Sequence, residues 1–102
     1  MIQKFYEMIR LLYEKTDRGG IYWEATVNGS TFAITITDFR ISIGEDAGSV
    51  CLKIFNKTGS IIESVSDEEV PVISKVYKSA RRQVMNADGA IYDLVESLSK
   101  WH

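Results

Sequence analysis

The spacing of apolar residues predicts helices at both ends of the chain. Residues 2–17 place apolar side chains three and four positions apart, and Gly19-Gly20 follows as a stop signal. A capping box at residues 66–69 and a proline at Pro71 offer two possible starts for a second helix. The apolar stripe of that helix runs over residues 73–84. A glycine-containing break then precedes a last amphipathic helix.

A β-hairpin is predicted directly after the first helix. Residues 21–27 and 30–36 both alternate apolar and polar positions, and Asn28-Gly29 lies between them. Asn-Gly is the dipeptide preferred in a two-residue type I′ turn, because both positions need positive φ. That turn sets a register in which Ala25 opposes Phe32. The large apolar side chains of both strands then share one face.

The extended pattern continues beyond this hairpin. The parity of the apolar positions changes by one residue at Thr37-Asp38, which predicts a β-bulge or bend within a long strand. A loop at residues 44–48 and a turn at residues 56–59 separate two further strands, at residues 50–54 and 60–65.

The fold class predicted by this order is a single α+β domain over residues 1–102. A four-stranded antiparallel meander is expected, with the N-terminal helix and the two C-terminal helices packed on one sheet face. The expected core consists of Ile9, Leu12, Trp23, Phe32, Ile34, Ile36, Leu52, Ile54, Val76, Tyr77 and Leu94.

Composition and charge exclude several classes of protein. A hydrophobic content of 45% excludes a disordered chain. The net charge of −2 disfavours nucleic acid as the partner, since phosphate binding usually needs a positive excess. Apolar runs fall far short of the roughly 20 residues that span a bilayer, so no membrane partner is expected. With Cys51 as the single cysteine, a reducing, cytoplasmic setting is predicted.

The sequence predicts no catalytic, metal or cofactor site. Its one histidine, His102, is the last residue, where a rigid catalytic geometry is not expected. Cys51 alternates with the apolar Val50 and Leu52, as a small buried side chain does. One cysteine and one terminal histidine do not supply the ligands of a structural zinc site, and no phosphate-binding glycine loop is present.

The C-terminal helices resemble those of a known group. Residues 76–83 read Val-Tyr-Lys-Ser-Ala-Arg-Arg-Gln, and a break at Gly89 is followed by Ala90, Leu94 and Leu98. This pattern resembles the closing helices of small bacterial α-β4-α-α proteins of uncharacterised activity, which share an L-Y-x-x-A-R-R helix, a glycine break and an amphipathic final helix. Val76 departs from the usual leucine. The resemblance covers about residues 70–100 and implies a bacterial or phage setting, with no activity attached.

Two polar surfaces are candidate binding sites for a protein partner. One is the open face of the hairpin, which is expected to present Tyr22, Thr26, Thr31 and Thr35. The other is the exposed face of the second helix, which carries Lys75, Lys78, Arg81 and Arg82 without an intervening acid.

The function expected from these features is that of a small, non-enzymatic protein-interaction module. An immunity-type or phage-encoded inhibitor that binds and blocks its partner fits this profile. The alternative is a carboxylate-based enzyme or ligand binder without histidine, in which Glu24 or Asp38 lies in a cleft near Arg40 or Tyr22. A third hypothesis is weak nucleic-acid binding through the basic helix.

Self-association is expected through the hairpin's polar face. The only charged residue on this face is Glu24. If the face were buried between two copies, their two Glu24 carboxylates would lie opposite each other and repel. The sequence therefore predicts a weak homodimer that uses this face and leaves Glu24 outside its centre.

Overall fold

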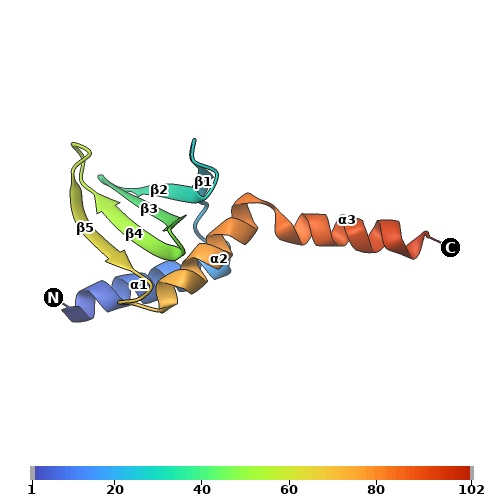
Figure 1. Ribbon diagram of the computed structural model, residues 1–102, viewed down its shortest axis with the longest axis horizontal. Helices are drawn as coiled ribbons and strands as arrows, with labels where there is room; N and C mark the ends of the chain where they lie inside the picture. The colour runs from blue at the N-terminus through green and yellow to red at the C-terminus, as the bar shows by residue number, and fades with distance from the viewer. Residues whose placement is uncertain (1, 102) are drawn as a thin grey trace.

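A computed structural model describes residues 2–101. The chain forms a five-stranded sheet with helices before and after it (Figure 1). The elements, in chain order, are α1 (Ile2–Asp17), β1 (Glu24–Ala25), β2 (Thr31–Ile36), β3 (Phe39–Asp46), β4 (Ser49–Phe55), β5 (Ile61–Ser66), α2 (Val72–Val84) and α3 (Ala87–Ser99). The predicted α+β class with an antiparallel sheet is confirmed.

The sheet is an antiparallel meander in which neighbouring strands are consecutive along the chain, from β1 to β5. The prediction of four strands was wrong by one. Thr37-Asp38 is not a bulge but the two-residue turn of a hairpin, across which Ile36 pairs with Phe39. Thr37 adopts a φ of 55°, as tight hairpin turns require. This turn reverses the chain and also accounts for the one-residue change in the parity of the apolar positions.

The first hairpin keeps its predicted register but not its predicted turn. Ala25 does pair with Phe32, yet β1 is only two residues long. Neither Asn28 nor Gly29 has positive φ, so the type I′ prediction was wrong. The Thr31 backbone N–H instead donates to the Asn28 carbonyl at 3.0 Å, and the Asn28 side chain accepts from the Ser30 N–H at 3.1 Å. The asparagine thus stabilises a wider turn of another type.

The type I′ geometry occurs between β3 and β4 instead. Ala47 and Gly48 have φ of 53° and 84°, and the flanking Asp46 and Ser49 pair with each other. An alanine in this left-handed region is strained by its Cβ, whereas asparagine tolerates it better.

Ala47→Asn is therefore expected to raise the free energy of unfolding by about 0.5–1 kcal/mol, measured by urea denaturation. The neighbouring change Gly48→Ala is the control with opposite sign. A Cβ added at Gly48 meets no other atom within 4 Å. This variant should therefore lose about 1 kcal/mol of unfolding free energy through backbone strain alone. A less stable Ala47→Asn variant would contradict this turn geometry.

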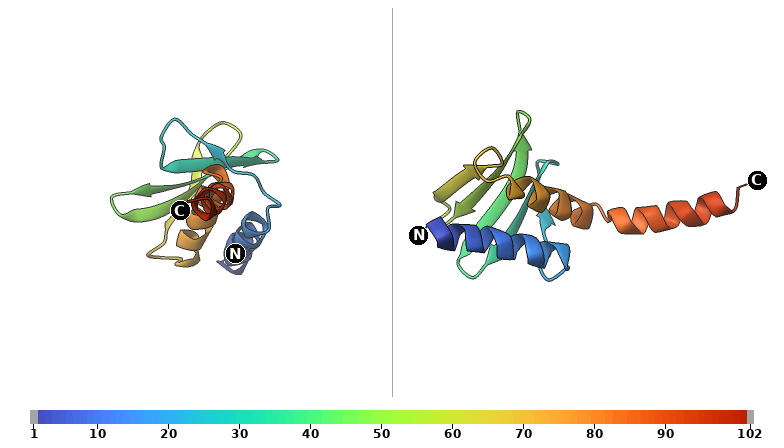
Figure 2. Two further views of the ribbon diagram at one scale, coloured as in Figure 1. Left: turned by 90° about the vertical axis from the view of Figure 1, so that its right-hand side faces the viewer. Right: turned by 90° about the horizontal axis from the view of Figure 1, so that it is seen from below.

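The core lies between the sheet and helices α1 and α2, which pack side by side on one sheet face (Figure 2). Nine of the eleven predicted core residues are buried or packed against the core. The strands and helices also contribute Ile41, Ile43, Val50, Val65, Val70, Ile73 and Ala80. Ile36 was predicted wrongly and is 41% exposed, since it ends β2 beside the turn, where α1 covers it only in part.

Helix α3 does not join this core. The prediction that both C-terminal helices pack on the sheet was wrong, because α3 runs away from the body and none of its residues is buried (Figures 1 and 2). Leu94, predicted as core, is 58% exposed. The change of direction occurs at Asn86, whose φ of 52° interrupts the helical backbone, and the molecule extends to 58 × 28 × 27 Å.

Within residues 2–101, no helix is long and apolar enough to cross a membrane.

Candidate protein-binding surfaces

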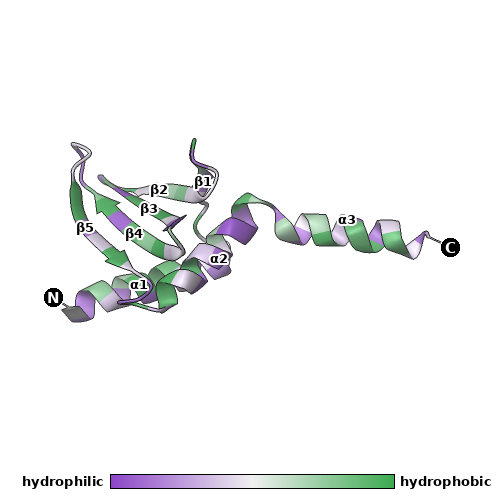
Figure 3. Ribbon diagram, viewed as in Figure 1, coloured by the Kyte–Doolittle hydropathy of each residue, from purple (hydrophilic) through white to green (hydrophobic). Residues whose placement is uncertain are grey.

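The projecting helix α3 presents an apolar stripe to solvent. Ile91, Leu94, Val95 and Leu98 recur at helical spacing and are each 50–61% exposed. The hydropathy colouring shows apolar bands along the whole helix (Figure 3). Trp101, directly beyond α3, is 78% exposed. Sequence reasoning found this stripe but assigned it to the core, because periodicity identifies an apolar face and not what covers it.

A hollow of about 450 Å³ lies where α2 meets α3. It is lined by Lys78, Arg81, Arg82, Met85 and Ala87. Ala87 precedes Ile91 by four residues, so the stripe of α3 continues into this hollow. Met85 is also exposed there. The junction therefore combines an apolar floor with a basic rim.

The predicted basic face of α2 is present at this junction. Lys78, Arg81 and Arg82 are exposed, as is Lys75 one turn earlier. Arg82 forms an ion pair with Asp88 at the start of α3. Within residues 2–101, no carboxylate makes an ion pair with the other three cations. Acids of α3 follow directly, which weakens the attraction of this face for phosphate.

The predicted polar face of the hairpin is only partly assembled. Thr31 and Thr35 lie on one side of β2, opposite Gly44 and Arg40 of β3. Thr31 lies so close over Gly44 that a Cβ there would collide with its hydroxyl. Tyr22 precedes β1, and Thr26 is held in the turn by hydrogen bonds from its hydroxyl to two carbonyls. The four residues do not form one strand face.

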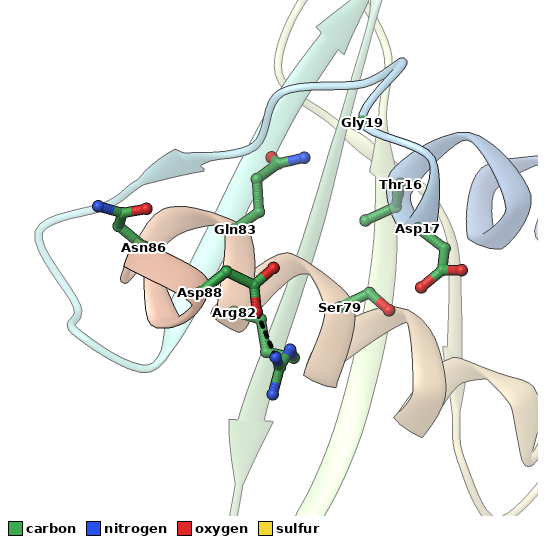
Figure 4. A pocket seen from close by; sticks show the side chains of 8 residues that line it. All are labelled: Thr16, Asp17, Gly19, Ser79, Arg82, Gln83, Asn86 and Asp88. Carbon is green, nitrogen blue, oxygen red and sulfur yellow. Dashed lines mark hydrogen bonds and ion pairs between the residues drawn. The ribbon is translucent and has the colours of Figure 1, made fainter. Parts of the chain in front are cut away.

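A polar hollow of about 280 Å³ lies between α1, α2 and the start of α3 (Figure 4). Two of the side chains that line it, Thr16 and Gln83, already form hydrogen bonds within the protein. The Thr16 hydroxyl accepts from Trp23 Nε1–H at 2.9 Å, and the Gln83 amide bridges the backbone of Trp23 and Ile21 at 2.6 Å on each side. These hydrogen bonds therefore hold the segment before β1 against α1 and α2.

A second hollow, of about 530 Å³, opens beside the turns that follow β2 and β4. Asp38 and Arg40 both line it, together with Phe55 and Lys57. Glu24 and Tyr22, which were the other candidates for carboxylate chemistry, do not. Asp38 and Arg40 are both exposed, and catalytic carboxylates generally owe their reactivity to burial or to a close charge.

Of the residues weighed for nucleophilic or metal chemistry, the structure describes Cys51 and not His102. Cys51 is half-buried on β4, where it pairs with Gly44 and Ser66. His102 lies outside the described residues. Over residues 2–101, no three histidine, cysteine or acidic side chains gather into a metal-binding group.

Comparisons with protein-family models, curated proteins and solved structures find no match to this chain. The resemblance of its closing helices to small bacterial proteins therefore stays a prediction.

Proposed function

We propose that this protein is a non-enzymatic protein-interaction module that uses α3 as its recognition helix. The observation that carries the proposal is the exposed stripe of Ile91, Leu94, Val95 and Leu98 on a helix without a single buried residue. Large exposed apolar patches on a monomer usually mark interaction sites. An amphipathic helix of this kind binds by laying its apolar face into a groove.

The body supports this role by holding α3 away from itself. The left-handed backbone of Asn86 interrupts the helix where the chain leaves α2, and the exposed ion pair between Arg82 and Asp88 spans this break. A helix that fills a partner's groove also blocks that groove, so an immunity-type or phage-encoded inhibitor in a bacterial cytoplasm is the finer form of the proposal. A lone cysteine, Cys51, is compatible with a reducing compartment.

The proposal is tested by using the tagged full-length chain as bait in a bacterial lysate. A protein is expected to be retained in near-stoichiometric amount by the wild type and by Ser64→Glu, which adds the same charge to an exposed position of β5. Leu94→Glu should lower retention at least about tenfold, since a carboxylate buried without a partner costs more than 1.4 kcal/mol. Equal retention by the three chains would refute the use of α3.

A carboxylate-based ligand binder is the second candidate. It is favoured by the convergence of Asp38 and Arg40 on one hollow of about 530 Å³. A ligand of mixed charge would engage both side chains. It should protect the folded chain against thermal unfolding, and Asp38→Asn should remove that protection. A screen of such ligands without any shift in Tm would count against this candidate.

A further inference from the structure

The stripe on α3 needs a covering surface. An isolated helix shorter than about 12–15 residues is marginal in water, and α3 has 13 residues with no buried side chain. Its stability must therefore come from packing against something outside its own chain's core. Trp101, just beyond the end of α3, adds a further exposed apolar side chain.

The two C-terminal helices have opposite charge. Helix α2 contains four cations and no acid, while α3 contains three acids and no cation. The acids of α3 are Asp88, Asp93 and Glu96. In one chain the helices follow each other end to end, so that only Asp88 reaches a cation of α2. The distal acids stay without an ion pair among the described residues.

A second copy of the chain offers what each α3 lacks. If two copies align their C-terminal helices antiparallel, the distal half of each α3 lies over the α2–α3 junction of the other. The acidic Glu96 then approaches the basic rim at Lys78 and Arg81. Leu94 then lies over the hollow that Met85 lines, where the two apolar side chains can be buried together.

We propose that this chain forms a symmetric homodimer in which α3 of each copy lies antiparallel against the α2–α3 junction of the other and fills its hollow. The inference rests on the proposed function, since both use α3. Each copy supplies one α3, which is acidic and apolar, and one hollow with basic side chains. Two copies can therefore satisfy each other in a closed dimer with two-fold symmetry. Because two short helices make a small contact, the dimer should be weak and form only as the concentration rises.

Sedimentation velocity of the full chain at increasing concentration tests this dimer. The wild type should shift from monomer to dimer, and Leu94→Glu should remain monomeric. Arg81→Glu and Glu96→Arg should each raise the Kd about tenfold or more, as loss of a pair in contact does at an interface. The double variant, Arg81→Glu with Glu96→Arg, should recover most of the affinity, because it restores opposite charges across the interface.

Lys75→Glu is the matched control, since it reverses a charge on the same helix but does not line the hollow. Circular dichroism confirms that each variant is folded. A wild type that stays monomeric at every concentration overturns the inference. A dimer that survives Leu94→Glu but is lost with Thr31→Arg, on the sheet face, or with Met8→Glu, on α1, overturns it as well. If the wild type is monomeric and still retains a lysate protein that Leu94→Glu does not retain, the proposed function is supported and the homodimer is refuted.

Discussion

Phe32→Ala is expected to lower the free energy of unfolding by about 3–5 kcal/mol. Phe32 is only 1% exposed, and its ring lies 5.7 Å from that of Tyr77, centroid to centroid, where β2 meets α2. Truncation therefore leaves a cavity between the sheet and the helix and removes an aromatic contact. A domain of this size has about 5–15 kcal/mol of stability in total, so much of it would be lost.

The same substitution at an exposed position is the control for this prediction. Phe39→Ala changes a ring that is exposed at the start of β3 and should cost below about 1 kcal/mol. Urea denaturation followed by far-ultraviolet circular dichroism compares the two variants. Equal losses for both would contradict the placement of the core on the α1–α2 face of the sheet.

Gln83→Leu is expected to lower the free energy of unfolding by about 2–4 kcal/mol. The Gln83 side chain accepts a hydrogen bond from the Trp23 backbone N–H and donates one to the Ile21 carbonyl. Leucine has a similar volume but leaves both backbone groups without these partners. Because the two groups belong to the segment before β1, the loss should also loosen Trp23.

Gln83→Glu separates the two hydrogen bonds. Glutamate keeps an acceptor for the Trp23 N–H but cannot donate to the Ile21 carbonyl when ionised, so an intermediate loss is expected at neutral pH. Denaturation followed by tryptophan fluorescence and by circular dichroism measures all three chains. If the leucine variant proved as stable as the wild type, α2 would not anchor the segment before β1.

This same contact explains why the first hairpin could be predicted only in part. A two-residue loop at Asn28-Gly29 correctly predicted the register of Ala25 with Phe32, although the turn type was wrong. It could not show that Ile21 and Trp23 would form hydrogen bonds with Gln83, sixty residues later, in place of β2. A long-range side-chain partner that shortens a strand leaves no local signal in the sequence.

Turn chemistry was predictable where a side chain determines it locally. The Asn56 side chain accepts two hydrogen bonds from Thr58 within the predicted turn at residues 56–59 and one from the Ser60 N–H just after it, and Gly59 has a positive φ. Thr37-Asp38 contains no glycine or asparagine, so its tight turn was mistaken for a bulge. The same holds for Ala47, an alanine in a conformation that its own Cβ disfavours.

For the apolar stripe of α3, the sequence predicts the residues of the stripe but not what covers them. Helical periodicity placed Leu94 and Leu98 on one apolar face, which is correct for the helix. It could not distinguish packing within the chain from packing against another molecule, because both bury the same residues. The left-handed Asn86 directs α3 away from the body, and that single backbone conformation decides between the two outcomes.

Hydrogen exchange of the α3 amides at increasing protein concentration shows whether α3 is a recognition helix that does not pack on the body of its own chain. At the lowest concentration we expect the amides of residues 91–99 to exchange far faster than those of β3 and β4, because the part of the chain that the structure describes buries no residue of that helix. Their protection should then rise with concentration, while that of the sheet stays constant. Protection of α3 equal to that of the sheet at every concentration would mean that α3 packs on its own body, which would contradict the account.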